Sequence, residues 1–468
     1  MKIISNISKC IIVIGCFLIW SCEDFVEVET PDYFLTTQNV YNNDESADRA
    51  LRGMLNQLFN ISFANGSYQS VSFLGGLSAD NYDLYSNSQE LISFYYNNIP
   101  VNNNNNLSLW SGAYNAIYQS NALLEGVRDN SDLSTALVNK IEGVSRFVRA
   151  FTYFHLLNLY DEVPLILTTD YQSNALASET DRQEIYNQII LDLETASELL
   201  SDSYADNDRT VPNTYACYAL LARVHLFLEN YQAAEDYSSL VIQASDQYTL
   251  LSDFDMVFLA DSEEAIWQIS PIGWGTSFTH TRDGNALIKT PTVSTPLALS
   301  RNFLESYDPT DLRLENWVDY IIQNEDTLFY PYKYKIQYEN SGEITEYSMV
   351  MRFAEQYLIR AEARTMLSKF AQAIEDINTI RERSGISPIS NTEDSHNQDL
   401  ILQLVINERR KELFSEWGHR WFDLVRFEML EELSEKNNSE FSTPRSLLFP
   451  IPDSERERNP NLNQNPGY

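Results

Sequence analysis

Two stretches of this 468-residue chain, 219–242 and 358–381, align with each other without a gap. In both, a small residue and a leucine precede a break, and an aromatic and a second small residue follow it. The matched positions are Ala222 with Ala361, Leu228 with Leu367, Tyr231 with Phe370, and Ala234 with Ala373. Small residues let two helices approach closely, and the aromatic ring fills the next groove. The repeat therefore predicts helix pairs of the tetratricopeptide type.

Four further segments carry apolar residues at helical spacing: 43–60, 109–127, 134–160 and 181–200. Apolar side chains that recur every three or four residues predict an amphipathic helix. The last segment also opens with an acid-rich turn, which suits the positive end of a helix dipole. Together with the repeat, these segments predict a mainly α fold.

Two regions, 66–108 and 252–350, break the helical pattern. The second contains Gly, Pro and Thr, with short alternating runs such as 264–270 that are typical of strands. Long irregular segments in a compact protein are usually functional or disordered. Region 252–350 is rich in Trp and Tyr, whereas disordered segments are poor in aromatics. We therefore expect this region to fold into long loops and a few short strands.

The N-terminus has the features of an export signal. Two lysines accompany an unbroken apolar run at 10–20, which is about half the ~20 residues that a membrane-spanning helix needs. Such a run is typical of a signal peptide. The run ends in Ser21 and Cys22, a pattern typical of a bacterial lipobox, although Trp20 stands where smaller residues are usual. We therefore predict that Cys22 is lipidated; ordinary cleavage nearby and an uncleaved anchor are the alternatives.

The predicted organisation follows from that cleavage point. Residues 1–21 form the signal peptide, 22–42 a lipidated tether and N-terminal extended segment, and 43–468 a single domain. Of the four cysteines only Cys217 lies beyond the lipidation site, so no disulfide can form within the mature chain. With 43% hydrophobic residues and this length, the core can hold without one.

The charge of the chain excludes one class of partner. The net charge is −35, and it becomes −37 once residues 1–21 leave, because they contain two lysines and no acid. Binding of nucleic acid depends on Lys and Arg that neutralise phosphates. A chain this acidic is therefore not expected to bind nucleic acid.

No motif of a known catalytic class is present. The sequence contains no HExxH, no GxSxG and no Walker loop. His155 and His225 lie in apolar helical stretches, where we expect them to pack. The acidic loops 78–83 and 204–209 lack EF-hand spacing, so we predict no metal and no cofactor. Acidic pairs are so frequent that a glycosidase-like carboxylate pair stays open.

Residues 406–427 alternate charges around large apolar side chains. Glu408 with Glu412, and Arg409 with Glu412 or Glu416, stand at spacings that place them on the same side of a helix. We interpret this segment as a scaffold helix whose charges pair on one face while its aromatics pack on the other.

The chain resembles the SusD/RagB family of outer-membrane nutrient-binding lipoproteins over nearly its whole length. The resemblance includes the lipobox that ends in Cys22. The other segments that resemble the family are 110–127, 142–166, 182–196, 214–242, 351–363, 406–427 and the ending LLFPIPDSERERNPNLNQNPGY at 447–468. Two departures are small: Trp20 in the lipobox, and Asp161-Glu162 where Gly-Asp is usual.

The resemblance implies a SusD-like scaffold of tetratricopeptide-like helical pairs, with the irregular regions as the ligand face. It implies a protein without enzymatic activity that sits on the outer surface of the outer membrane, anchored by lipid such as palmitate on Cys22. It also implies a partner, a SusC-like TonB-dependent transporter, which receives oligosaccharides or, in some members, peptides. Glu23 and Asp24 resemble the surface-export tag of such lipoproteins.

The family's ligand-facing positions fall in regions 66–108 and 252–350. Sugars are held by flat aromatic side chains together with polar groups at the rim. Our candidates for aromatic platforms are Trp274, Trp317, Tyr320, Tyr82 and Tyr85, with Asp80 and Asn81 as polar contacts. Trp274 stands between two glycines, which suits an exposed loop. Trp110, Trp417 and Trp421 are assigned to the scaffold.

Three hypotheses for the function remain open. The first is a surface lipoprotein that binds oligosaccharide and delivers it to a barrel transporter. The second is the same architecture with a peptide ligand. The third is a glycoside hydrolase with a dispersed carboxylate pair. The sequence does not decide between sugar and peptide, because tyrosine-rich sites serve both.

Overall fold

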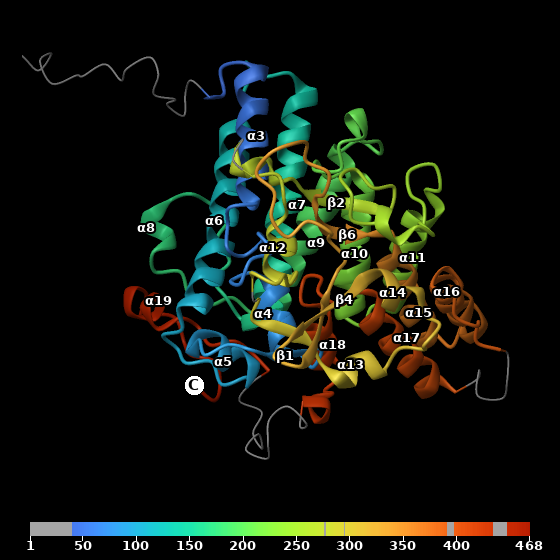
Figure 1. The fold of residues 1–468 in the computed structure, drawn as a ribbon. Helices are drawn as coiled ribbons and strands as arrows, with labels where there is room; N and C mark the ends of the chain where they lie inside the picture. The colour runs from blue at the N-terminus through green and yellow to red at the C-terminus, as the bar shows by residue number, and fades with distance from the viewer. Residues whose placement is uncertain (1–39, 276–277, 294, 391–396, 434–446) are drawn as a thin grey trace, which may run out of the picture.

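Four long helices stand side by side and form one side of the molecule (Figure 1). The computed structural model describes residues 40–275, 278–293, 295–390, 397–433 and 447–468. The four helices are α3 (Asp44–Leu58), α6 (Asn104–Val127), α7 (Thr135–Tyr160) and α9 (Arg182–Leu199). α7 packs against both α6 and α9, and α3 lies against α6 and α7. All four helices predicted from apolar spacing are confirmed, and α6 begins five residues before the predicted start.

Polar side chains fix where these helices begin. Asn43, Asn103, Ser134 and Asp181 each precede a helix and accept a hydrogen bond from a backbone N–H of its first turn. Such a cap satisfies an N–H that has no partner within the helix, and it contributes about 1 kcal/mol.

The repeat is confirmed as two helix pairs (Figure 1, right). The pairs are α10 (Thr214–Phe227) with α11 (Tyr231–Gln243), and α15 (Phe353–Met366) with α16 (Phe370–Arg383). The matched aromatics begin the second helix of each pair, and the four matched alanines are fully buried. Ala222 and Ala234 pack against Ile359 and Ala363 of α15. The small side chains therefore let the first pair lie directly on the second.

The two irregular regions are folded, and strands join them. β1 (Tyr82–Leu84) pairs with β3 (Leu297–Leu299), so that Tyr82 stands opposite Leu299. β2 (Ala265–Ile269) pairs with β6 (Ser348–Arg352), and β4 (Val318–Gln323) with β5 (Asp326–Pro331). All three sheets are antiparallel, and β3 lies against β5. The strand predicted at 264–270 is confirmed.

Short helices and 3-10 turns complete the described chain. The helices are α4 (Val71–Ser78), α5 (Gln89–Tyr95), α8 (Tyr171–Asn174), α12 (Arg282–Leu287), α13 (Arg301–Glu305), α14 (Leu312–Trp317), α17 (Gln398–Glu412), α18 (His419–Arg426) and α19 (Asp453–Arg458). The 3-10 turns are η2 (Ala205–Asn207), η3 (Phe254–Met256), η4 (Pro271–Trp274) and η6 (Leu430–Leu433). None of the helices in the described ranges is both long and apolar enough to cross a membrane.

One apolar core extends through the molecule, from Ala47 in α3 to Leu462 near the C-terminus. Trp110, Trp417 and Trp421 belong to it, so their assignment to the scaffold is confirmed. His155 is also buried, beside Phe151 and Trp417, and burial lowers its pKa to about 3. The predicted packing role of His155 is therefore confirmed.

The prediction that 406–427 forms a single helix is wrong, because the segment is divided into two helices. α17 ends at Glu412 and α18 begins at His419, because the chain turns at Gly418, whose φ is +69°. That left-handed conformation suits glycine. Most of its charges are buried. Arg409 and Arg426 pair with Asp423 inside the segment, whereas Glu412 and Glu416 pair with Arg352 of β6.

Arg352 and Glu412 form the centre of this buried ion cluster. Arg352 lies 2.9 Å from Glu264, 2.5 Å from Glu412 and 2.8 Å from Glu416. Burial opposes the charge of Glu412, but Arg383, Arg352 and Arg313 hold its pKa well below the usual range. The cluster joins β2, β6, α14 and α17, and so it fixes the frame beneath the irregular regions.

Candidate ligand-binding site

The structure contradicts two of the predicted aromatic platforms. Trp317 has no exposed surface: its Nε1 donates to the carbonyl of Phe254 at 3.3 Å, and its ring lies 5.0 Å from that of Phe254. Tyr82 is 2% exposed, and its hydroxyl lies 2.5 Å from the hydroxyl of Ser415. Both rings are core residues, because neither presents a face to solvent.

The two predicted polar contacts are also engaged inside the protein. Asp80 accepts two hydrogen bonds of 2.7 Å from Arg420, and Arg410 lies 3.0 Å away. Asn81 accepts a bond of 2.8 Å from Arg410. Burial alone would raise the pKa of Asp80, but the two arginines hold it below the usual value. These residues join α18 and α17 to the start of β1, so the prediction that they contact ligand is wrong.

Trp274 ends η4, and its side chain lies outside the described part of the structure. The two positions that flank Trp274 favour glycine for different reasons. A Cβ on Gly273 would stand 2.4 Å from the carbonyl oxygen of Asn56 in α3, so this position needs glycine for close approach. Gly275 has a φ of +72°, which favours glycine for its conformation. The role of Trp274 as a platform stays a prediction.

Tyr85 is exposed as predicted, and it belongs to a group of tyrosines that the sequence did not single out. The tyrosine patch consists of Tyr85, which follows β1, and of Tyr95 and Tyr96 at the end of α5. Tyr85 and Tyr96 are 50% and 44% exposed, and Tyr95 is partly buried. The rings of Tyr95 and Tyr96 meet edge to face at 5.0 Å. The patch therefore offers aromatic surface to solvent at the lower end of the molecule, where β1 and α5 lie in Figure 1.

Local bonds hold the tyrosine patch in place. The Tyr85 N–H donates to the carbonyl of Pro296 at 2.6 Å, which fastens the end of β1 to the segment before β3. The Tyr95 hydroxyl donates to Asp83 at 3.5 Å. Burial, Asp83, Tyr96 and Tyr85 together raise the pKa of Tyr95. The Tyr95 phenol is therefore a neutral donor at physiological pH.

Charged groups surround the patch. Burial, Asp83 and Asp326 raise the pKa of Tyr85, which places the β4–β5 turn near its ring. Lys289 Nζ lies 5.9 Å from the centre of the Tyr85 ring, and burial lowers the pKa of this lysine to about 8. Lys289 is itself buried, and its Nζ donates to the carbonyl of Thr295, so carboxylates are the polar groups at the edge of the patch. Aromatic surface edged by carboxylates can both stack on a ligand and hydrogen-bond its rim.

Tyr320 is the second predicted platform that the structure leaves exposed. It lies in β4 opposite Phe329 of β5, and the two rings are 5.7 Å apart. Tyr320 is 56% exposed, and Ile322, two residues along the same face, is 70% exposed. This hairpin face presents apolar surface to solvent, so a ligand role for Tyr320 stays a prediction.

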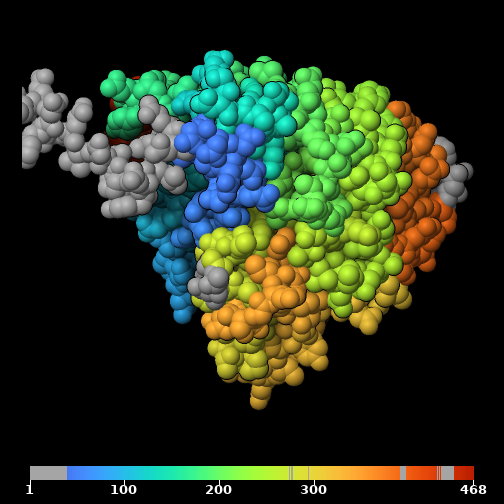
Figure 2. Space-filling model, turned by 90° about the horizontal axis from the view of Figure 1, so that it is seen from above, coloured from blue at the N-terminus to red at the C-terminus, as the bar shows by residue number. Residues whose placement is uncertain are grey.

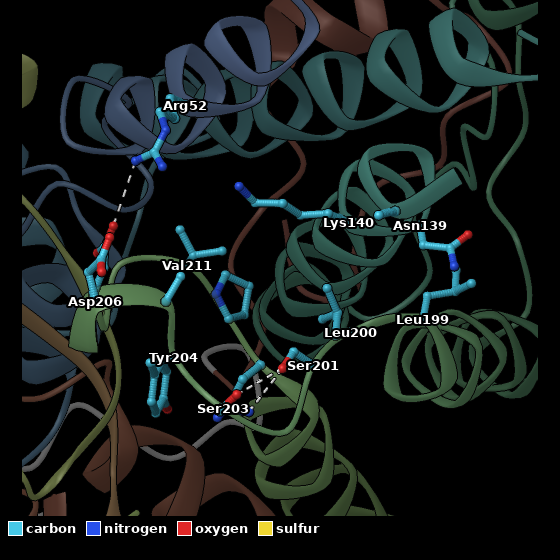
Figure 3. Close-up of a pocket in the computed structure, with 15 residues that line it drawn as sticks. Arg52, Asn139, Lys140, Leu199, Leu200, Ser201, Ser203, Tyr204, Asp206 and Val211 are labelled. Carbon is cyan, nitrogen blue, oxygen red and sulfur yellow. Dashed lines mark hydrogen bonds and ion pairs between the residues drawn. The ribbon is translucent and has the colours of Figure 1, made fainter. Parts of the chain in front are cut away.

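A cavity that the sequence did not reveal lies elsewhere on the molecule (Figure 3). It has a volume of about 590 Å³. It lies between α3, the start of α7, the end of α9 and the loop that leads to α10. Its lining residues are Arg52, Ala136, Asn139, Lys140, Leu199, Leu200, Ser201, Ser203, Tyr204, Ala205, Asp206, Asp208, Val211, Pro212 and Asn213. None of the seven predicted site residues lines it.

Nucleophilic and metal-binding side chains are not gathered in the described structure. Cys217 is buried in α10, and burial raises the pKa of its thiol. Burial and neighbouring arginines lower the pKa of His419 well below its usual value. Among the described residues, no group of three His, Cys, Asp or Glu side chains is arranged to hold a metal ion.

Comparison with known families decides the relationship. Residues 318–468 match the family model described as the SusD family. Residues 34–226 match a second model, described as starch-binding associating with outer membrane. SusD-like protein P2 of Formosa agariphila is 26% identical over 96% of this chain and 97% of its own length. The chain belongs to the SusD/RagB family. SusD-like protein P25 of the same organism is 25% identical over 99% of this chain and 98% of its own length.

Solved SusD structures share the fold. A SusD superfamily protein from Bacteroides vulgatus has a TM-score of 0.79 at 21% identity, over 92% of this chain and 100% of that one. A laminarin-binding SusD-like protein has a TM-score of 0.75 at 20% identity, over 91% and 100%. Surface glycan-binding protein A from Bacteroides uniformis has a TM-score of 0.74 at 20% identity, over 90% and 99%. The predicted mainly α, SusD-like fold is confirmed.

Two surfaces of this SusD/RagB member are therefore candidates for ligand binding. The tyrosine patch lies within the regions that the family resemblance assigned to the ligand. The cavity lies outside them. Sequence reasoning reached Tyr85 through the family resemblance, which assigned 66–108 to the ligand face. It missed Tyr95 and Tyr96 because the sequence does not show which rings are exposed.

Proposed function

We propose that this protein is a lipoprotein of the outer-membrane surface that binds oligosaccharide and delivers it to a SusC-like TonB-dependent transporter. The tyrosine patch carries the proposal, because it puts exposed aromatic surface and carboxylates together within a SusD/RagB scaffold. Relatives described as laminarin-binding and surface glycan-binding share that fold.

The patch suits a sugar for a chemical reason. The C–H face of a sugar ring packs on an aromatic ring, while its hydroxyls need donors and acceptors at the rim. Tyr85 and Tyr96 supply the rings, and Asp83 and Asp326 are acceptors. Because Asp326 comes from the β4–β5 hairpin, the ligand would contact both irregular regions at once.

Binding measurements on purified protein test this site. We expect a neutral oligosaccharide, from a panel that includes laminari- and malto-oligosaccharides, to bind the wild type. Replacing Tyr85 and Tyr96 together by Ala should weaken that binding at least thirtyfold, since losing an aromatic anchor costs about 2 kcal/mol or more. Tyr171→Ala is the matched control, because Tyr171 is 81% exposed on α8, away from the patch.

Three results would argue against the proposal. If the protein binds peptides but no saccharide, its ligand is a peptide. If the double variant binds saccharide as tightly as the wild type does, the tyrosine patch is not the binding site. Release of products from any saccharide, lost when one Asp or Glu is changed, would make the protein an enzyme.

Anchoring and partnership need their own experiments. Cys22 lies outside the described residues, and we propose that it carries the lipid. Cys22→Ala should abolish metabolic labelling with palmitate and release the folded protein from the outer membrane; labelling that persists would contradict this assignment. The transporter should co-purify with the wild-type protein from detergent-solubilised outer membranes, and its absence from such preparations would count against delivery.

A further inference from the structure

The cavity beside α3 has the size and shape of a site for a small ligand. Its volume of about 590 Å³ falls within the range of such pockets. Four segments form its walls: Arg52 from α3, Lys140 from α7, Leu199 from α9 and the loop around Asp206 (Figure 3). These segments gather on the face seen in Figure 2, where α3 lies beside the green residues near 200.

The cavity is far from the tyrosine patch. Lys140 lines the cavity near the start of α7, and Tyr160 ends the same helix. At 1.5 Å per residue, these two positions are about 30 Å apart. The Tyr160 ring lies 6.0 Å from that of Phe449, which lies 5.1 Å from Phe94 of α5, the helix that carries Tyr95. The two surfaces can therefore be altered independently.

The charges around the cavity are largely balanced within its walls. Asp48 lies 2.7 Å from Lys140 and 2.9 Å from Arg52, and Asp208 lies 3.7 Å from Arg52. The hydrogen bond to Asp48, and the charges of Asp208 and Asp206, raise the pKa of Arg52 against the effect of burial. An ionic ligand would have to compete with these existing pairs. The walls therefore favour a neutral ligand.

Polar groups remain available for such a ligand. Within the described chain, no hydrogen bond or ion pair engages the amide of Asn139 or the carboxylate of Asp206. The hydroxyls of Ser201 and Ser203 bond to each other at 3.1 Å and are exposed. These groups offer an amide, a carboxylate and two hydroxyls, which match a ligand rich in hydroxyl groups.

Apolar surface completes the lining. Leu199, Leu200, Val211 and Pro212 contribute aliphatic side chains. The hydroxyl of Tyr204 bonds to the Tyr248 hydroxyl and to the carbonyl of Ile266, at 2.7 and 2.6 Å. Arg209 covers one face of its ring at 4.2 Å from the centre. Tyr204 therefore turns its hydroxyl away, and what it offers to the cavity is ring carbon.

We infer that this cavity is a second saccharide site, which takes a short neutral oligosaccharide independently of the tyrosine patch. The inference rests on the proposed function, because it assigns the same class of ligand to a separate place. The aliphatic wall and the Tyr204 ring would pack against the C–H faces of the sugar. Asn139, Asp206, Ser201 and Ser203 would bond its hydroxyls.

Stoichiometry tests the inference on the full-length protein. Isothermal titration with laminarihexaose and maltohexaose should give two sites per chain for the saccharide that binds. The Tyr85→Ala/Tyr96→Ala variant should keep one site. In that variant, saturating saccharide should slow amide hydrogen exchange across residues 201–211, which border the cavity.

A blocking variant with a matched control gives the reverse test. Ala136→Trp places a large side chain into the cavity from the exposed first turn of α7, and it should remove one site and keep the other. Thr135→Trp adds the same side chain at the neighbouring exposed position, which does not line the cavity, and it should keep both sites. Asn139→Ala/Asp206→Ala should weaken the second site at least tenfold.

The outcomes separate this inference from the proposed function. One site per chain, abolished by the tyrosine substitutions and unaffected by Ala136→Trp, overturns the second site and leaves the function standing. A single site that Ala136→Trp abolishes and the tyrosine substitutions leave intact supports the cavity as a saccharide site and excludes the tyrosine patch. No saccharide binding in the wild type overturns both.

Discussion

Replacing Trp317 by Ala separates a scaffold role from a ligand role most sharply. The ring is fully buried where α14 meets β4, among Phe254, Phe258 and Phe414. Lys333 Nζ lies 4.5 Å from its centre. Removing the ring therefore leaves a cavity that is enclosed by aromatic side chains and lies next to the buried ion cluster.

The expected loss follows from the area of the side chain. A buried Trp removes about 150–250 Å² from water, which at ~25 cal/mol per Å² contributes about 4–6 kcal/mol. Measured Trp→Ala changes in cores are about 3–5 kcal/mol. The substitution also leaves the Phe254 carbonyl without the bond from Nε1, which adds about 1–3 kcal/mol. We therefore expect the free energy of unfolding to fall by about 4 kcal/mol or more, a large share of a typical total.

Urea unfolding of Trp317→Ala, Trp317→Phe and Tyr320→Ala measures this prediction. Trp317→Phe keeps a ring but loses the Nε1–H donor, so its loss should be smaller. Tyr320→Ala, three residues further along the chain, is the control; because Tyr320 is exposed, the unfolding free energy of this variant should change by less than about 0.5 kcal/mol. If Trp317→Ala unfolds within about 1 kcal/mol of the wild type while saccharide affinity falls, the reasoning from burial is refuted.

Three further substitutions test single features. Burial raises the pKa of Glu346 to about 7 although it accepts a bond from the Lys335 N–H at 2.6 Å, so the folded state holds its proton more tightly than the unfolded state does. The stability that this proton contributes is present below pH ~4.5 and is lost as pH rises through 7. In urea unfolding, Glu346→Gln should therefore leave the unfolding free energy almost unchanged at pH 4.5 and raise it by up to about 3 kcal/mol at pH 8. Equal effects at both pH values would contradict this. Asp80→Ala removes the carboxylate that neutralises Arg420 and Arg410 and should cost about 3–5 kcal/mol of unfolding free energy, whereas a loss below 1 kcal/mol would show that the pairing is dispensable. Trp274→Ala should weaken saccharide binding about thirtyfold with an unchanged melting temperature; an early melt, or unchanged binding, would exclude Trp274 as a platform.

The helical scaffold could be predicted because its signals are local. Ala222, Ala234, Ala361 and Ala373 stand at matched positions that predict a close helix pair, and all four are buried as expected. The predicted helices over 134–160 and 181–200 match α7 and α9 to within one residue at each end. Apolar spacing, capping residues and small residues act within one or two turns, so the chain itself displays them.

The ligand face could be predicted only in part. Trp317 and Tyr320 are three residues apart, yet one is fully buried and the other is 56% exposed. α14 ends at Trp317 and β4 begins at Val318, so the periodicity of the side chains changes between them. No composition or spacing marks that boundary, and the aromatic content alone therefore placed both rings in the site.

Sequence alone determined that the chain is mainly helical and that it pairs helices through alanines. The tertiary structure decided which charges and rings are buried. Arg352 meets Glu412 across 60 residues and Glu264 across 88, and the cavity gathers residues from three separate stretches of the chain. Burial and ion pairing depend on which distant segments of the chain come into contact, and those contacts form only when the helices pack.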